Sequence, residues 1–193
     1  MRPAFAAGGL PSMLFAVSAA IWMVTELAQA LRRRPNAADS DRFSMLVLRV
    51  CITCGVLLAV FALRVPAAAF PYTSVLLGLS LTLLWFGGGL RWWCFRTLGG
   101  YFTFNVMTSP DQPVITTGPY RVLRHPSYTG FLLALLGVGL AFGNWLSLAA
   151  LMLFATIGVL NRIRVEEAAL SAAIGPRYAD FARTRKRLIP YVW

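Results

Sequence analysis

The stretch YTGFLLALLGVGLAFGNWLSLAALMLFATIGVLNRI, residues 128–163, decides the fold of this chain. It contains two apolar segments, Tyr128–Phe142 and Trp145–Ile163, and only Gly143 and Asn144 separate them. A helix that crosses a membrane needs roughly 20 apolar residues, with about 17 as the lower limit. The first segment is therefore short for a span, and the two residues between the segments predict a tight helical hairpin.

Three further apolar segments precede this hairpin, at Leu10–Leu31, Met45–Leu63 and Thr73–Leu90. Of the 193 residues, 58% are hydrophobic and 13% are charged, whereas about a quarter of the residues in a soluble domain are charged. Long apolar runs without alternation indicate an integral membrane protein. We therefore predict an all-α integral membrane fold with about five transmembrane helices.

The length predicts a single membrane domain over residues 1–193. Within it, residues 1–93 hold three N-terminal spans. Residues 94–193 hold the helical hairpin, a motif region and an amphipathic C-terminal tail. The triplet AQA at Ala28–Ala30 imitates a signal-peptide cleavage site, but Arg32–Arg34 follows at once and resists translocation. The first segment is thus expected to be a retained span.

The basic residues predict the orientation in the membrane, because cytoplasmic loops carry an excess of Lys and Arg. With the N-terminus outside, Arg2 and Arg64 lie outside and the other sixteen of the 18 basic residues lie inside. We expect a bacterial inner (cytoplasmic) membrane protein with its C-terminus in the cytoplasm. The net charge is +11, and the basic residues lie beside apolar spans. This pattern favours an anionic membrane surface over nucleic acid as the binding partner.

Several polar or small residues within the spans have structural interpretations. The three cysteines are too few for a disulfide framework, and the CxxC of Cys51 and Cys54 lacks a second ligand pair, so no metal site is predicted. Gly87–Gly89 predicts close helix packing or a kink rather than phosphate binding. Glu26, near the inner end of the first segment, could reach the interface or pair with Arg49.

His125 is the only histidine and lies in GPYRVLRHPSY, residues 118–128. Pro126 keeps His125 out of helical geometry and itself fits the first helical position, so His125 is predicted to cap the fourth helix. The first backbone N–H groups of that helix, including those of Ser127 and Tyr128, then lack helical acceptors. They lie at the positive end of the helix dipole, and two arginines are close by. Such a site can bind a carboxylate; the alternative is a capped interfacial helix with arginines on lipid phosphates.

The segment NRIRVEEAALSAAIGPRYADFARTRKRLIP, residues 161–190, carries the other ionisable cluster. Arg162 and Glu166 are four residues apart and share a helix face, and Arg164 and Glu167 share the adjacent face. Ionisable groups at the inner end of a span usually pair or line a cavity. The alternative is a snorkelling pair of arginines with solvated glutamates.

The end of the chain predicts a second, shorter helix. Gly175 should end the fifth helix and Pro176 should begin the next one. Tyr178 and Phe181 lie on one side of that helix. The basic run at residues 183–187 suits a membrane surface.

Taken together, TTGPYRVLRHPSYTG (residues 116–130) and NRIRVEEAAL with GPRYADFARTRKRLIP (161–170 and 175–190) resemble the isoprenylcysteine carboxyl methyltransferase family. The resemblance covers about the last ninety residues. It implies a membrane methyltransferase that uses S-adenosyl-L-methionine, with a cytoplasmic cofactor site formed by the C-terminal half. Its substrate would be a lipophilic small molecule or a prenylated substrate in the membrane lipid.

The resemblance also implies roles for individual residues. Arg162 would face the substrate carboxylate, and Glu166, the first of the two neighbouring glutamates, would hold the cofactor. The remaining residues implied to contact the cofactor are Gln112, Pro113, Val114, Ile115, Tyr120, His125, Pro126, Ser127 and Tyr128.

The chemistry of the acceptor leaves several functions open. A carboxylate acceptor is already ionised at pH 7, so its methylation needs alignment and exclusion of water but no general base. A phospholipid N-methyltransferase would need a proton acceptor for its protonated amine, and Glu167 would be the catalytic candidate. A steroid-reductase-like enzyme with a nicotinamide cofactor shares a related RHP.Y segment, and a non-catalytic membrane scaffold is the fourth alternative. The GPYR and RLIP segments favour the carboxyl methyltransferase.

Overall fold

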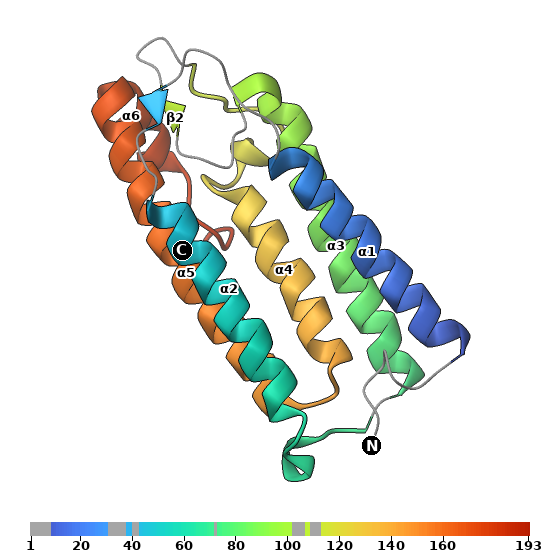
Figure 1. The fold of residues 1–193 in the computed structure, drawn as a ribbon. Coiled ribbons are helices and arrows are strands. Elements are labelled where there is room, and N and C mark those ends of the chain that lie inside the picture. The colour runs from blue at the N-terminus through green and yellow to red at the C-terminus, as the bar shows by residue number, and fades with distance from the viewer. Residues whose placement is uncertain (1–8, 31–37, 40–42, 72, 102–106, 109–112) are drawn as a thin grey trace.

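The computed structural model describes residues 9–30, 38–39, 43–71, 73–101, 107–108 and 113–193. In these residues, long helices run side by side and a short helix follows the last of them (Figure 1). The helices are α1 (Leu10–Ala30), α2 (Phe43–Ala62), α3 (Ser74–Leu98), α4 (Pro126–Ala141), α5 (Trp145–Ile174) and α6 (Pro176–Thr184). Single 3-10 turns lie at η2 (Pro66–Ala68), η3 (Gly99–Tyr101) and η4 (Gly118–Arg121), and the two-residue strands β1 (Ala38–Asp39) and β2 (Met107–Thr108) pair antiparallel.

The described helices confirm the predicted membrane fold. α1, α2, α3 and α5 are each long and apolar enough to cross a membrane. α4 has 16 residues and is the short member of the set, as the sequence predicts. The protein is therefore an all-α integral membrane protein with about five candidate spans.

The end of α3 differs from the prediction. The third apolar segment was expected to stop at Leu90 and to be followed by a polar loop, but α3 continues to Leu98. Residues 91–98, RWWCFRTL, contain neither proline nor glycine, so no residue ends the helix before Gly99, whose φ is +53°. Arg91 consequently lies on a rigid helix that packs against α4.

Glycine contacts bring α3 and α4 into backbone contact. A Cβ atom on Gly87 would lie 2.4 Å from the carbonyl oxygen of Gly130, and one on Gly130 would lie 2.6 Å from the carbonyl oxygen of Gly87. No other residue type fits at such a distance. The predicted packing role of Gly87 is therefore confirmed, and the contact fixes α4 against α3 near its beginning.

The hairpin between α4 and α5 is tied to the end of α2. Asn144 caps α5 by accepting a hydrogen bond from the Ser147 N–H at 3.0 Å. Its amide Nδ2 donates to the carbonyl oxygens of Ala62 and Val65, both at 3.2 Å. Ser147 Oγ also donates to the carbonyl oxygen of Ala59 at 2.6 Å. These bonds set α5 alongside α2, and α5 carries the two glutamates at its far end.

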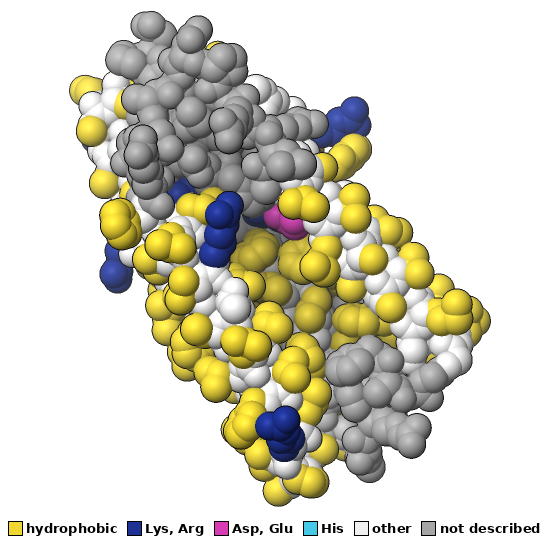
Figure 2. Space-filling view, in the orientation of Figure 1, with side chains coloured by type: hydrophobic (Ala, Val, Ile, Leu, Met, Phe, Trp, Pro, Cys, Tyr) yellow, Lys and Arg dark blue, Asp and Glu magenta, His cyan; other side chains and the backbone are white. Residues whose placement is uncertain are grey.

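The molecule is hollowed between α2 and α1, over α4 (Figure 2). Hydrophobic side chains line this hollow, and acidic side chains lie at the end nearer the beginning of α4. α1, α2 and α4 also share a hydrophobic cluster, against which Trp22 on α1, Ile52 on α2 and Phe131 on α4 pack while only partly buried. The rings of Trp22 and Phe131 have centroids 6.0 Å apart. An apolar space thus leads to the polar end of the bundle.

Candidate active site

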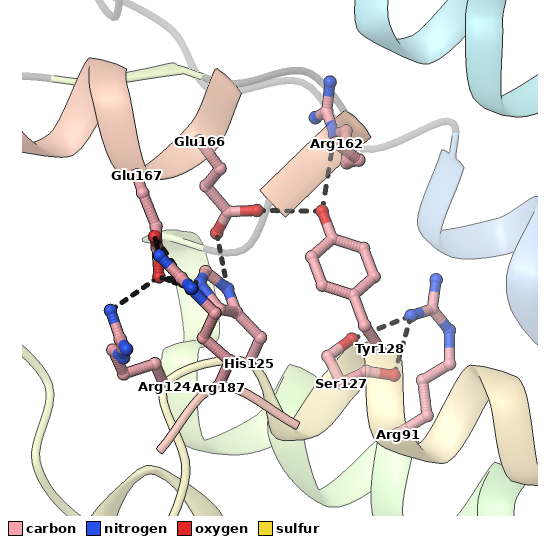
Figure 3. Close-up of polar contacts among 9 residues, drawn as sticks. All are labelled: Arg91, Arg124, His125, Ser127, Tyr128, Arg162, Glu166, Glu167 and Arg187. Carbon is pink, nitrogen blue, oxygen red and sulfur yellow. Dashed lines mark hydrogen bonds and ion pairs between the residues drawn. The ribbon is translucent and has the colours of Figure 1, made fainter. Parts of the chain in front are cut away.

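The candidate site lies at the beginning of α4, where His125 precedes the helix and Pro126 occupies its first turn. The His125 side chain is 4% exposed and makes no capping hydrogen bond. Its Nε2 lies 3.2 Å from Glu167 Oε1, and its Nδ1 lies 3.8 Å from Glu166 Oε1 (Figure 3). The N–H of Tyr128 donates to the His125 carbonyl at 3.0 Å.

These contacts correct two expectations about the helix start. His125 is the N-cap by position, but its imidazole does not cap, because two carboxylates of α5 lie within reach and bonds to ionised groups are the stronger ones. The Tyr128 N–H is not available to an anion, because it already has an acceptor. The charged groups beside His125 are therefore side chains, namely the carboxylates of Glu166 and Glu167.

The backbone at His125 is held by the C-terminal segment, residues 185–188. The N–H groups of Arg124 and His125 donate to the carbonyl oxygens of Lys186 and Arg187 at 2.8 and 3.0 Å. Thr129 Oγ1 donates to the carbonyl oxygen of Leu188 at 2.7 Å. The Leu188 side chain is itself buried against α5.

Glu167 joins three parts of the chain. Its carboxylate accepts hydrogen bonds from Arg124 Nη1 at 2.7 Å and from Arg187 Nη2 at 2.8 Å, and it also contacts His125. The hydrogen bonds to Glu167 raise the pKa of the Arg187 guanidinium above its usual value. The Glu167 side chain is 14% exposed. Arg187, a member of the basic run predicted to suit a membrane surface, pairs with this carboxylate while 37% of its side chain stays exposed.

Glu166, one residue earlier, has a different environment. Its Oε2 accepts a hydrogen bond from the Tyr128 hydroxyl at 2.8 Å, and the same hydroxyl accepts one from Arg162 Nε at 3.3 Å. The Glu166 side chain is 31% exposed, about twice the exposure of Glu167. Tyr128 thus links Glu166 and Arg162, which the sequence placed on one helix face (Figure 3).

Arg162 is buried rather than open to the surface, with an exposed fraction of 2%. Its Nη1 donates to Ser44 Oγ on α2 at 2.6 Å. The snorkelling interpretation of Arg162 is therefore wrong, because its guanidinium is held between α2, α4 and α5.

Arg91 on α3 holds the other side of the α4 beginning. Its Nε pairs with Glu26 on α1, and its Nη1 donates to Ser127 Oγ at 2.7 Å and to the Ser127 carbonyl at 3.2 Å. Of the two alternatives for Glu26, neither named this partner: it pairs with Arg91, because the extended α3 brings Arg91 next to α1. Ser127, expected to contact the cofactor, directs its hydroxyl to Arg91 (Figure 3).

The lead-in to the site is only partly described. Gln112 lies outside the described residues, and Pro113 is exposed. Val114 packs against a buried cluster formed by Ile174 at the end of α5 and by Tyr178 and Phe181 on α6. Tyr120, on η4, is 7% exposed, and burial raises the pKa of its hydroxyl well above the usual value. Tyr120 is therefore a neutral side chain near the carboxylates rather than a phenolate.

Sequence reasoning missed four residues that shape the site. Glu26 and Arg91 carried a usable signal, since ionisable groups in or beside an apolar span usually find each other. Ser44 and Arg187 carried none. Ser44 is 118 residues from Arg162, and Arg187 reaches Glu167 only because the chain turns back after α6.

The arrangement suits the binding of a small zwitterion beside an anion. Glu166 is a partly exposed carboxylate that can attract an ammonium group, and Arg162 offers a guanidinium suited to a carboxylate. Tyr128 holds the Glu166 carboxylate and the Arg162 guanidinium in fixed positions, and the close packing of α3 against α4 supports it. The alignment of two reactants requires such fixed positions. Fold and site together define an all-helical membrane protein with a cluster of charged and polar side chains at one end of its helices.

Comparison with known proteins shows which family the chain resembles. Residues 79–172 match the model of the isoprenylcysteine carboxyl methyltransferase (ICMT) family. The matched residues include α4, most of α3 and nearly all of α5, with His125, Arg162 and both glutamates. The match covers just under half of the chain, and it confirms the resemblance to the ICMT family that the sequence predicts.

Individual relatives agree with this placement. Protein-S-isoprenylcysteine O-methyltransferase B of Arabidopsis thaliana is 30% identical over 115 residues, which are 58% of this chain and 58% of that protein. The uncharacterized protein YpbQ of Bacillus subtilis (strain 168) is 27% identical over 81 residues, 42% of this chain and 48% of that protein. The chain thus spans about half the length of the curated relatives it matches.

A solved structure confirms the fold. The structure of the eukaryotic intramembrane Ras methyltransferase ICMT superposes with a TM-score of 0.66 and covers 97% of this chain and 70% of that chain. The sequence identity is 21%, so this likeness bears on the arrangement of the helices.

Proposed function

We propose that this protein is a membrane methyltransferase that transfers a methyl group from S-adenosyl-L-methionine to the carboxylate of a lipophilic, isoprenoid-like substrate. The observation that carries the proposal is the pairing of Glu166 and Arg162 through Tyr128 within the region that matches the ICMT family. Acidic side-chain atoms are exposed at one end of the apolar hollow in the space-filling view (Figure 2).

The residues present fit the cofactor. Its amino-acid part carries an ammonium and a carboxylate, and Glu166 combines 31% exposure with an Oε1 that faces His125 at 3.8 Å, so it can accept from an ammonium. We propose that Glu166, His125 and Tyr128 hold this part of the cofactor, with Tyr120 and Pro126 behind them. Gln112, Pro113, Val114 and Ile115 are proposed to line the remainder. When bound, the cofactor supplies an electrophilic methyl group.

Ser127 is proposed to act on the site indirectly. Its hydroxyl accepts from Arg91, so it holds the first turn of α4 in place rather than reaching toward Glu166. The buried pair of Arg91 and Glu26 would thereby position His125 and Tyr128.

Arg162 is proposed to orient the substrate carboxylate. Its guanidinium is buried at the junction of α2, α4 and α5, where Ser44 Oγ is one of its acceptors. A substrate carboxylate that replaces Ser44 as acceptor would gain a stronger, charge-assisted bond. The apolar tail of the substrate would then lie in the hollow between α1 and α2 (Figure 2).

The environment of Glu167 favours carboxylate over amine chemistry. A general base needs a carboxylate that can take up a proton, but Glu167 is bound by Arg124, Arg187 and His125. Cations next to a carboxylate favour its ionised form and oppose protonation. We therefore propose that Glu167 is a positioning residue and not a proton acceptor.

Methyl transfer by the purified protein tests the proposal. We expect labelled S-adenosyl-L-methionine to methylate a prenylcysteine or a fatty carboxylic acid, and not the matched carboxamide, which lacks the nucleophile. Methylation of an ethanolamine lipid instead would establish the phospholipid N-methyltransferase. Binding of reduced nicotinamide without S-adenosyl-L-methionine would indicate the reductase, and binding of neither would indicate a scaffold.

Arg162→Lys separates substrate orientation from cofactor binding. The lysine keeps the charge but loses the planar fork that matches a carboxylate. We expect most of the carboxyl methylation to be lost while S-adenosyl-L-methionine still binds by calorimetry. Full activity of this variant would remove Arg162 from the substrate site.

The site is proposed to face the cytoplasm from a bacterial inner membrane. Asp180→Cys, near the site end, and Val75→Cys, at the beginning of α3, are both exposed positions and give a matched pair. An impermeant thiol reagent added to intact cells should label the Val75 variant and spare the Asp180 variant. The reverse pattern would invert the proposed topology.

A further inference from the structure

A cleft between α1 and α3 lies outside the candidate active site. Its volume is about 260 Å³, and its lining comes from these two helices alone. The two hydroxyl side chains in its wall have partners: Ser18 Oγ accepts from Trp85 Nε1 at 3.1 Å, and Thr25 Oγ1 donates to the Trp22 carbonyl at 2.7 Å. Trp22 Nε1 is buried and has no hydrogen-bond partner among the described residues. The surface left for a ligand is therefore mainly hydrocarbon and indole.

The cleft exists because α3 lacks side chains at two successive positions. A Cβ atom on Gly88 would touch Trp22 at 3.4 Å, whereas one on Gly89 would meet nothing within 4 Å. Trp85 and Trp92, each about half exposed, lie on either side of these glycines along α3. The result is an open apolar slot with flat walls.

Positive charge lies at one end of the slot. The guanidinium of Arg96 is 4.5 Å from the centroid of the Trp92 ring, one turn further along α3. Arg96 is exposed and makes no ion pair with any residue in the described part of the chain. The acidic group nearest in sequence to the α1 side of the slot, Glu26, is already paired with Arg91.

We propose that this cleft binds an anionic phospholipid, with an acyl chain in the slot and the phosphate against Arg96. The slot matches a hydrocarbon chain in chemistry, and burial of methylene groups favours binding. The guanidinium matches a phosphate in charge and geometry. Phosphatidylcholine has the same chains but no net charge, so its binding to the cleft should be weaker. The proposal does not depend on the enzymatic activity.

Native mass spectrometry of the detergent-purified protein tests the proposal by titration with phosphatidylglycerol or phosphatidylcholine of identical chains. Gly89→Leu fills the slot, and Gly78→Leu is its control, because a Cβ atom at Gly78 on the same helix also meets nothing within 4 Å. We expect Gly89→Leu to weaken binding of both lipids by about tenfold, equivalent to roughly two buried methylene groups. Gly78→Leu should leave binding unchanged.

Charge recognition is tested by Arg96→Gln, with Arg64→Gln as its control. Arg64 also stacks on an aromatic ring, Phe61, at 5.1 Å, but it lies beyond the end of α2, away from the slot. Arg96→Gln should reduce the preference for phosphatidylglycerol by about fivefold, the effect of one basic residue near an anionic headgroup. Arg64→Gln should retain it.

Two results would overturn the proposal: equal lipid binding by the Gly89 and Gly78 variants, or an unchanged lipid preference in Arg96→Gln. If Gly89→Leu does not fold, Ile21→Phe fills the slot from α1 and the same comparison applies.

Discussion

The two neighbouring glutamates of α5 mark two regions of the site with different construction. Glu167 faces the closed region, where two arginines and a histidine bind its carboxylate. Glu166 faces the open region, where Tyr128 binds one oxygen and twice as much of the side chain is exposed. Successive residues of a helix point about 100° apart, so adjacent identical side chains meet different neighbours.

This difference teaches which carboxylate can bind a ligand. A carboxylate whose hydrogen-bonding capacity is filled by the protein stabilises the fold. One that keeps capacity and exposure can bind a cation from outside. The following variants are chosen to break or sharpen this division.

Glu167→Gln should have the largest effect, and it should fall on stability. The amide keeps the shape but removes the negative charge, which leaves Arg124 and Arg187 uncompensated in a largely buried place. Removing one partner from a buried pair costs about 3–5 kcal/mol, and the exposed part of Arg187 places the expected loss near the lower end. Thermal unfolding in detergent measures it.

The matched control for stability is Glu166→Gln, which should unfold at nearly the wild-type temperature. If both variants lose the same stability, the closed and open regions do not differ as proposed.

Glu166→Gln should instead weaken the binding of S-adenosyl-L-methionine. The loss of a charge-assisted hydrogen bond to the cofactor ammonium corresponds to about 1.5–3 kcal/mol. Calorimetry at constant pH measures the affinity, and His125→Ala should show a loss of similar size. Unchanged affinity in both variants would remove these residues from the cofactor site.

The sequence predicted the elements of this site better than their contacts. Hydropathy located the spans, and Gly175 and Pro176 ended α5 and began α6 as predicted, because these signals are local. The predicted hairpin of α4 and α5 also placed His125, before α4, near Arg162 and the two glutamates on α5.

The contacts depended on distant segments and were not predictable in the same way. Arg187 reaches Glu167 through a reversal of the chain after α6, and Arg91 reaches Glu26 because α3 continues past its apolar run. The absence of proline and glycine from residues 91–98 is a local signal for the longer α3, whereas no local signal indicates the reversal that brings Arg187 to Glu167. Both corrections concern charged residues, whose partners are decided by the tertiary fold.

The smallest expected effect tests how the closed region is fastened. Thr129 Oγ1 donates to the Leu188 carbonyl, and Thr129→Val keeps the shape while removing that donor. A neutral hydrogen bond contributes about 0.5–1.5 kcal/mol, so the C-terminal segment should open about two to ten times more often. Hydrogen exchange measures this at the amides of Arg124 and His125, which donate to the same segment.

Thr25→Val is the control, because its hydroxyl bonds within the exposed turn of α1 and its loss should leave these amides unchanged. Faster exchange at both amides in Thr129→Val alone would show that residues 185–188 hold His125 in place. Unchanged exchange would mean that the Glu167 ion pairs hold the segment without Thr129.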